Sequence, residues 1–363
     1  MTDMTEISKL SKTELIKKCE ELGINKCKSK NKTELLTLIT NKIHNNNNIF
    51  VEPVETTKPE YPDKPEHTEN NKIYEKNNIK LIHGNCFEKL ELVDDKSVQL
   101  ICIDPPYNIG KDDWDNINDY GNFMINIIKK LQDKLKDNGS FFIFHNDMEF
   151  ISELMVSIKK NTKLVFKQML VWNKRFDESS KKGFMDGFVV KNDMHNFNKM
   201  AEYILFYTFD NSYKLEHTRK QLNVSQLTIS QEIKSKTGGL TGWYSNLETG
   251  KNMPTRETIK PIEKHLNLCY EDIVPKFNNM KTHHSVWNYD MAKRCSVHVT
   301  PKPVDLLKNI ILHTTYENDV VLDCFAGSGS MGYACLETNR KCILIEKDVK
   351  YCNYIESELN KKK

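Results

Sequence analysis

The stretch that decides the predicted fold reads Val320-Val-Leu-Asp-Cys-Phe-Ala-Gly-Ser-Gly-Ser330. Its first three residues are apolar and predict a short buried strand, and the small residues that follow predict a tight turn into a helix over 330–338. Because glycine has no Cβ atom, Gly327 and Gly329 allow the turn and let a ligand approach the backbone. A strand, a glycine-containing turn and a helix in this order are typical of ligand-binding α/β sheets.

The next predicted strand covers 342–345 and ends at Glu346. An acid at the end of a second strand is suited to bind the hydroxyl groups of a ribose. The full Gly-x-Gly-x-x-Gly fingerprint is absent from the turn, which disfavours a nicotinamide dinucleotide. A turn of this kind also occurs where a strand simply joins a helix, so a second motif is needed to assign a function.

Strands and helices alternate along the chain from residue 79 onward. The predicted strands cover 79–82, 98–103, 140–144, 163–172 and 202–208, and the predicted helices cover 119–136, 149–160 and 304–313. This alternation predicts an α/β fold with a largely parallel, doubly wound sheet. Ligands bind to such sheets beyond the carboxyl ends of the strands, and both chemical motifs of this chain are predicted to lie there.

The second motif, Asp104-Pro105-Pro106-Tyr107, follows the strand 98–103. The two prolines fix φ and remove two donors, which directs the Pro105 carbonyl and the Asp104 carboxylate the same way. Two acceptors that point the same way suit an aryl amine, such as the amino group of adenine. The nitrogen of this amino group is a poor nucleophile because its lone pair is delocalised into the ring. Two acceptors for its hydrogens would favour a tetrahedral nitrogen, and Tyr107 offers a ring on which a flipped base can stack. An ordinary strand-to-loop turn is the alternative.

With both motifs present, the chain resembles the beta group of DNA amino-methyltransferases, in which the catalytic tetrapeptide precedes the cofactor turn. The resemblance covers residues 79–359 except an insert near 210–285. The segment from His298 to Pro303 is similar to the His-x-Thr-x-Lys-Pro segment that helps to hold the cofactor in this group. The resemblance implies a Rossmann-like methyltransferase sheet and S-adenosylmethionine as the cofactor.

The resemblance also implies a set of site residues. The implied catalytic residues are Asp104, Pro105, Pro106 and Tyr107. The implied cofactor-binding residues are Asp323, Phe325, Ala326, Gly327, Ser328, Gly329, Glu346, Asn85 and Lys302. Asn85 stands where the group often has an aspartate, so its contact with the cofactor is open.

The predicted reaction is direct transfer of the methyl group to the N6 amino group of adenine after base flipping. An aspartate before Pro-Pro-Tyr favours adenine within the group, and the N4 amino group of cytosine is the main alternative. Methylation of RNA or of a glutamine in protein, and a DNA-binding regulator whose catalytic domain has decayed, are further alternatives. No metal site is predicted, because no paired Cys/His spacing occurs.

Two segments precede the predicted catalytic domain of residues 79–360. Residues 5–44 resemble a SAP-like helical DNA-binding module, and Ser11-Lys-Thr-Glu14 predicts a capping box at the start of its first helix. A generic helical hairpin is the alternative. Residues 45–78 are rich in Asn and Pro and predict a disordered linker.

The insert at 210–285 interrupts the α/β alternation with predicted helices over 226–234, 240–247 and 258–266. Its pattern resembles a helix-turn-helix of the phage-repressor type, which implies a target-recognition region. Base-reading residues are predicted at Thr241, Trp243, Tyr244, Ser245 and Asn246, and phosphate-binding residues at Lys234, Lys236, Lys251 and Arg256. A second basic loop begins at Lys174 and Arg175, and its predicted partner is also DNA. A purely structural helical insert is the alternative.

Composition limits the other function classes. The chain has 363 residues with 53 Lys and Arg against 50 Asp and Glu, so a nucleic-acid partner must be argued from local patches. No apolar run of about 18 residues occurs, and the N-terminus is polar, so we expect a soluble intracellular protein. The expected partner is double-stranded DNA, with a homodimer and a separate restriction endonuclease as further possibilities.

Overall fold

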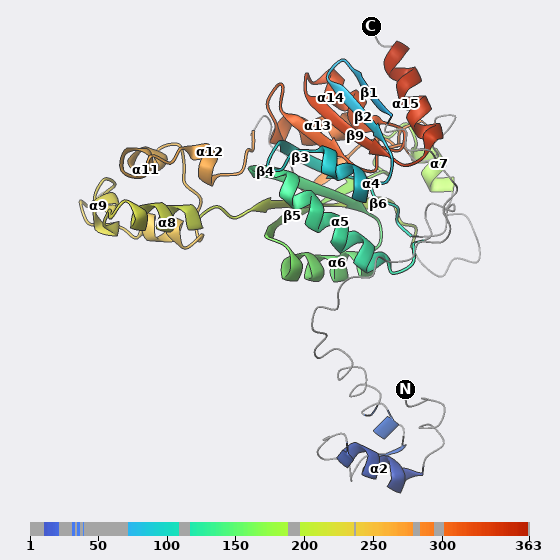
Figure 1. Cartoon of the computed structure of the whole chain (residues 1–363), viewed down its shortest axis with the longest axis horizontal. Helices are drawn as coiled ribbons and strands as arrows, with labels where there is room; N and C mark the ends of the chain where they lie inside the picture. Colours follow the sequence, from blue (N-terminus) through green and yellow to red (C-terminus); the bar gives the residue numbers. More distant parts are fainter. Residues whose placement is uncertain are drawn as a thin grey trace. The chain divides into compact units, whose positions relative to one another are not determined.

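The computed structural model divides the chain into two compact units, Met1–Glu69 and Asn70–Lys363 (Figure 1). The residues that it describes are 11–21, 31–32, 35–36, 39, 72–108, 117–187, 197–235, 237–278, 284–293 and 301–361. Within these ranges, no helix has the length and apolar character that crossing a membrane requires.

The first unit begins its described part with helix α2 (Lys12–Glu21). The predicted capping box is confirmed, because the Ser11 N–H donates to Glu14 Oε2 at 2.7 Å and the Glu14 N–H donates to Ser11 Oγ at 3.4 Å. Four fully buried side chains form a small core: Leu15, Cys19, Leu35 and Ile39. This core is consistent with the helical module that the sequence predicts. The predicted linker lies outside the described residues as far as residue 71.

The second unit is built on a mixed sheet of nine strands among the described residues. They are β1 (Ile73–Lys76), β2 (Ile79–His83), β3 (Val98–Ile103), β4 (Leu135–His145), β5 (Leu164–Asn173), β6 (Ala201–Phe209), β7 (Val286–Asn288), β8 (Val320–Asp323) and β9 (Lys341–Glu346). Their order is β1-β2-β9-β8-β3-β4-β6-β5-β7. The strands from β2 to β4 are parallel, whereas β1 and β6 run antiparallel to their neighbours. The predicted α/β fold is confirmed.

Strand β1 corrects one sequence prediction, because it lies inside the segment 45–78 that was predicted to be a disordered linker. Strands β1 and β2 pair from Ile73 opposite Ile82 to Lys76 opposite Ile79. The two residues between them, Asn77 and Asn78, have φ angles of 50° and 65°. Asparagine tolerates this left-handed conformation, which a two-residue hairpin turn requires. The hairpin was missed because the prediction for residues 45–78 rested on their Asn- and Pro-rich composition.

Helices cover both faces of the sheet (Figure 1). One face carries α4 (Cys86–Lys89), the short 3-10 turn Leu90–Leu92, α5 (Tyr120–Lys134) and α6 (Met148–Asn161), and the other carries α13 (Val304–Thr314), α14 (Ser330–Glu337) and α15 (Val349–Lys361). Successive side chains of a strand point to opposite faces. In β3, Ile101 and Ile103 accordingly pack with α5 and α6, and Leu100 and Cys102 pack with the other helices. The sheet is therefore apolar on both sides.

The insert is a separate helical bundle with its own core. Its helices are α8 (Tyr213–Gln221), α9 (Gln226–Ser230), α10 (Trp243–Glu248), α11 (Ile259–Leu266) and α12 (Tyr270–Ile273). Their buried side chains, among them Leu215, Tyr244, Leu247 and Ile262, form one cluster. Helices α8 and α12 were not predicted, and the helix predicted over 226–234 ends at Ser230.

Both ends of the insert are attached to the first residues of β4. Asn211 Nδ2 donates to the Asp137 carbonyl at 2.8 Å, and Lys214 Nζ donates to Asp137 Oδ2 at 2.8 Å. At the other end, the Lys276 N–H donates to the Asn138 carbonyl at 2.9 Å. The bundle therefore leaves the sheet and returns to it at one place.

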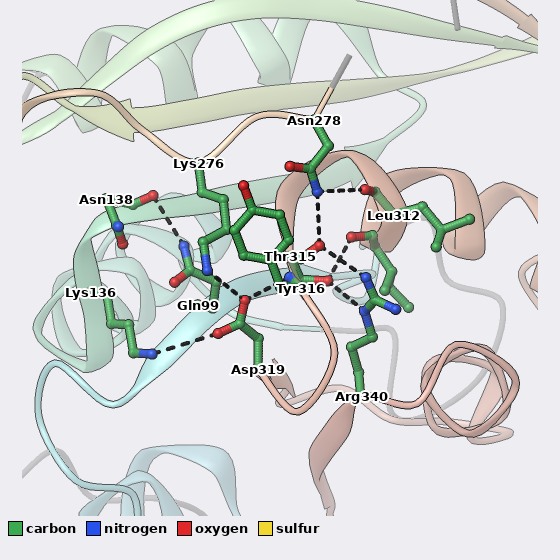
Figure 2. A network of polar contacts seen from close by, with 11 residues as sticks. Gln99, Lys136, Asn138, Lys276, Asn278, Leu312, Thr315, Tyr316, Asp319 and Arg340 are labelled. Carbon is green, nitrogen blue, oxygen red and sulfur yellow. Dashed lines mark hydrogen bonds and ion pairs between the residues drawn. The ribbon is translucent and has the colours of Figure 1, made fainter. Parts of the chain in front are cut away.

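Figure 2 shows the polar network that holds the returning end. Lys276 Nζ donates to Asp319 Oδ2 at 2.7 Å, and the same oxygen accepts the Tyr316 N–H at 2.7 Å. Asn278 Nδ2 donates to the carbonyls of Leu312 and Thr315, both at 3.0 Å. Asp319 directly precedes β8, so the network joins the insert to the beginning of that strand.

We predict that Asp319→Ala lowers the free energy of unfolding by about 1–3 kcal/mol, because it leaves the Lys276 ammonium and the Tyr316 N–H without their acceptor in a mostly buried place. Chemical denaturation with urea measures the change. The matched control is Lys136→Ala, which removes a longer and more exposed ion pair to the same aspartate at 3.8 Å and should cost less than about 1 kcal/mol. Equal losses in the two variants would contradict the role of the network.

Candidate active site

Four adjacent parallel strands bring the two sequence motifs to one edge of the sheet. The order β2-β9-β8-β3 places their carboxyl ends side by side. Asn85 follows β2, Glu346 ends β9, Asp323 ends β8 and Asp104 follows β3. Neighbouring strands lie about 4.8 Å apart, so the Asp104 loop and the turn after Asp323 are direct neighbours.

The turn after β8 is shaped by two glycines in the left-handed region, Gly327 at φ 50° and Gly329 at φ 78°. A Cβ atom added to Gly329 would lie 2.8 Å from Ile355 Cγ1, which is closer than side chains approach one another. The Gly327 N–H donates to Glu346 Oε2 at 2.7 Å. Glu346 therefore fixes the turn from the neighbouring strand.

Two buried carboxyl groups lie beside this turn, and burial raises the pKa of each to about 7. Asp323 Oδ1 accepts the Phe325 N–H at 3.0 Å, and Glu346 Oε1 accepts the Asp348 N–H at 2.8 Å. These hydrogen bonds favour the ionised forms but do not outweigh burial. Both groups are placed to ionise when a ligand brings donors or positive charge. No three His, Cys, Asp or Glu side chains of the described residues could together hold a metal ion.

Asn85, a predicted cofactor contact, is the N-cap of α4. Its Oδ1 accepts the Phe87 N–H at 3.0 Å, and the preceding Gly84 N–H donates to the Glu346 carbonyl at 2.8 Å. The residue is half-buried and lies next to Glu346. The structure therefore brings Asn85 to the predicted cofactor edge and assigns its side-chain oxygen a structural partner.

In the motif from Asp104 to Tyr107, both carboxylate oxygens of Asp104 accept hydrogen bonds from side chains. Oδ1 accepts from the Tyr107 hydroxyl at 2.8 Å, and Oδ2 accepts from Lys302 Nζ at 2.6 Å. Burial, together with the nearby charges of Asp104 and Glu202, raises the pKa of Tyr107 well above its usual range. The hydroxyl therefore stays protonated, and it orients the carboxylate.

A buried cluster of alternating charge surrounds Asp104. Lys302 Nζ lies 3.3 Å from Glu202 Oε2, and Lys174 Nζ donates to Glu202 Oε1. Burial would raise the pKa of Glu202, but the ammonium groups of Lys302 and Lys174 outweigh it and lower the pKa to about 2. Lys302 was predicted to contact the cofactor, and in this structure its ammonium binds the Asp104 carboxylate. The negative charges of Asp104 and Glu202 therefore balance the positive charges of Lys302 and Lys174.

The predicted DNA-binding cations Lys174 and Arg175 have acidic partners. Lys174 is bound to Glu202 and lies over the Trp172 ring at 4.6 Å. Arg175 forms a forked pair with Asp186, with Nε to Oδ1 at 2.9 Å and the second nitrogen to Oδ2 at 3.1 Å. The Lys174 ammonium therefore belongs to the charged cluster around Asp104, and Arg175 is half-exposed and paired with Asp186.

The insert residues differ in how far they reach the surface. Tyr244 is fully buried in the insert core, so the prediction that it reads bases is wrong. Trp243 donates its indole N–H to the Ser230 carbonyl at 3.2 Å and packs against the same core. Thr241, Ser245 and Asn246 are partly exposed. A helix of six residues presents few periodic positions, and its buried face was therefore misassigned.

Sequence reasoning missed two residues of the site, Glu202 and His145. Glu202 is an acid near the start of an otherwise apolar strand. An acid in such a strand could have been recognised from the sequence as a candidate site residue. His145 ends β4 and is fully buried, with its ring centroid 4.7 Å from that of Tyr107. Its Nδ1 accepts the Asp147 N–H at 3.1 Å, and burial lowers its pKa. The imidazole is therefore neutral and supports the Tyr107 ring.

We predict that Glu202→Gln lowers the free energy of unfolding by about 3 kcal/mol at neutral pH, because two buried ammonium groups lose a charged partner. The pKa of Glu202 falls from 4.5 to about 2 on folding, so this contribution is present above pH 4.5 and is lost as the pH falls toward 2. Urea denaturation at a series of pH values measures it. Glu216→Gln, an exposed pair partner of Lys220, is the control. If the difference in the free energy of unfolding between Glu202→Gln and wild type did not decrease at acid pH, the low pKa assigned to Glu202 would be contradicted.

Comparison with known proteins agrees with this geometry. Residues 98–357 match a family model described as DNA methylase, of the N6/N4 methyltransferases. The type II methyltransferase M1.MboII of Moraxella bovis is 31% identical over 294 residues, which are 78% of this chain and 97% of the relative. The DNA adenine methyltransferase YhdJ of Escherichia coli is 26% identical over 290 residues, which are 75% and 79% of the two chains.

A solved structure shares the fold. The cytosine-N4-specific PvuII DNA methyltransferase aligns with a TM-score of 0.51 at 12% identity and covers 78% of this chain and 90% of its own. The M1.HpyAVI complex with S-adenosylmethionine aligns with a TM-score of 0.46 at 18% identity, over 77% and 99% of the two chains. The family match and the shared edge of the two motifs lead to one conclusion: this chain belongs to the DNA methylase family and is an S-adenosylmethionine-dependent DNA amino-methyltransferase.

Proposed function

We propose that this enzyme methylates the N6 amino group of adenine in double-stranded DNA. One observation carries the proposal: the Asp104 carboxylate is held by Tyr107 and Lys302 at the same sheet edge as the turn from Asp323 to Gly329. An acceptor for an amino group and a turn suited to a cofactor are thus adjacent, as transfer between two bound molecules requires.

S-adenosylmethionine supplies an electrophilic methyl group on a sulfonium, so the amino nitrogen can displace it directly. Asp104 accepts one hydrogen of the amino group, and the Pro105 carbonyl accepts the other, which turns the nitrogen lone pair toward the cofactor turn. The new N–C bond forms as the C–S bond breaks, and the electrons of the broken bond remain on sulfur. Asp104 is placed to receive the surplus proton from the nitrogen.

Lys302 gives the site two states in this proposal. Its ammonium occupies Asp104 Oδ2 at 2.6 Å, and Glu202 Oε2 lies within 3.3 Å of the same nitrogen. When an amino group arrives at Oδ2, Lys302 can keep a carboxylate partner by shifting toward Glu202. The positive charge then stays buried with a partner, which avoids the cost of an isolated ion.

The choice of adenine is supported by the aspartate before Pro-Pro-Tyr and by the relative YhdJ, which is a DNA adenine methyltransferase. The motif order, with Asp104 ahead of the turn at Asp323, is that of the beta group and does not distinguish adenine from cytosine. The helical unit around α2 serves in this proposal as an additional, SAP-like DNA anchor. A restriction endonuclease partner and a homodimer remain predictions from the sequence.

We predict that Asp104→Ala reduces methyl transfer to mixed-sequence DNA by at least about a hundredfold, because the amino group loses its charged acceptor. Transfer of labelled methyl groups, followed by mass spectrometry of the nucleosides, measures both the rate and the product, which should be N6-methyladenine. Binding of S-adenosylmethionine, measured by calorimetry, should change little. The control is Asp95→Ala, which removes an exposed aspartate paired with Lys134.

Two results would contradict the proposal. Full turnover by the Asp104→Ala enzyme would exclude the carboxylate from the reaction. If the wild-type enzyme produced only N4-methylcytosine, the assignment of the active site would stand, but the target base would be cytosine instead of adenine.

A further inference from the structure

The insert is attached to the sheet at the edge opposite the active site. Strand β6 runs antiparallel to β4, with Ser140 opposite Thr208 and His145 opposite Tyr203. The end of β6, from which the insert departs, therefore lies beside the beginning of β4. The insert returns at Lys276, which binds Asn138 and Asp319 at the beginnings of β4 and β8. The catalytic motif follows the opposite ends of the parallel strands.

The length of β3 sets the distance between these edges. Its six residues span about 20 Å at about 3.3 Å per residue. That length corresponds to about six base pairs of duplex at about 3.4 Å each. The place where the insert is attached is therefore about this distance from Asp104, and the bundle extends from it away from the sheet (Figure 1). The insert is poorly placed to read the base pairs next to the methylated base.

The insert nevertheless carries a surface suited to a polyanion. Between residues 233 and 256 the sequence has four basic residues and one acid, Glu248. The Glu248 carboxylate is buried against Arg219, at 2.5 Å from Nε. The nearby Glu232 is bound to Lys264 and His265. Glu232 and Glu248 are thus neutralised within the insert, whereas Glu257, next to Arg256, is exposed.

Two exposed lysines flank the partly exposed polar residues of α10. Lys234 forms a β-bridge with Leu240, next to Thr241. The Lys251 N–H donates to the Asn246 carbonyl at 2.9 Å. We call this surface the α10 face, and it consists of Lys234, Thr241, Ser245, Asn246 and Lys251. Ammonium groups beside hydroxyl and amide groups suit phosphates and base edges.

We propose that the α10 face is a second DNA-binding site, which holds duplex DNA away from the base that is methylated. The inference rests on the proposed function, since the enzyme must act on DNA. It replaces target recognition at the methylated base as the role of the insert. The bound duplex is either a distant part of the same molecule or a second molecule, and both present the same phosphates.

The test compares wild type with a Lys234→Gln/Lys251→Gln double variant. Labelled methyl transfer is measured on mixed-sequence DNA, either intact or sheared to fragments of about one helical turn (about 10 base pairs), which extend only about five base pairs to either side of a central target. We expect the KM on intact DNA to rise about tenfold and kcat to stay unchanged, whereas kinetics on sheared DNA stay unchanged. The salt dependence of binding to intact DNA should weaken by about one logarithmic unit of slope per lysine.

Lys220→Gln is the matched control, because Lys220 is an exposed lysine of α8 outside the α10 face. Adding a separate unlabelled duplex to sheared DNA distinguishes the two sources: activation in the wild type alone indicates a second molecule. Equal losses on intact and sheared DNA would place the α10 face at the methylated base and overturn the proposal. No change on either substrate, with an unchanged salt slope, would exclude the face as a DNA site. Wild-type enzyme inactive on all DNA would instead refute the proposed function.

Discussion

The buried ammonium of Lys302, shared by Asp104 and Glu202, is the interaction on which the rest of the site depends. A buried charge is costly unless it is paired and hydrogen-bonded. Here each acid compensates a cation, and Lys174 supplies the fourth charge of the cluster. Removing Lys302 leaves Asp104 without a cation, and removing Glu202 leaves Lys174 without an acid. The cluster therefore fixes the Asp104 carboxylate more firmly than a loop after a strand could do alone.

The sheet makes this cluster possible because it gathers distant segments. Asp104 follows a parallel strand, Lys174 follows β5, and Glu202 is the second residue of the antiparallel strand β6. A strand that runs against its neighbours begins where they end, so Glu202 reaches the catalytic edge through the reversal of direction. The same reversal sends the end of β6, and the insert with it, to the opposite edge. One topological feature thus completes the active site and separates the insert from it.

The sequence predicted what local patterns determine. Apolar runs identified most strands, and the glycines and prolines identified the turns after Leu322 and Ile103. Partners distant in the sequence left no such pattern, so the role of Glu202 and the binding of Lys302 to Asp104 required the structure. Strand β1 was hidden by a polar composition, because its hairpin turn is made of two asparagines. The edge from which the insert departs depends on strand order, which periodicity does not encode.

The central claim is that Asp104 exchanges the Lys302 ammonium for the amino group of the target base. A structure of the enzyme with duplex DNA and a non-reactive analogue of S-adenosylmethionine tests it most directly. The account predicts an amino nitrogen within about 3.2 Å of the Asp104 carboxylate, with Lys302 Nζ shifted from Asp104 Oδ2 to Glu202. A flipped base whose amino group lies away from Asp104, with Lys302 still bound to Oδ2, would contradict it.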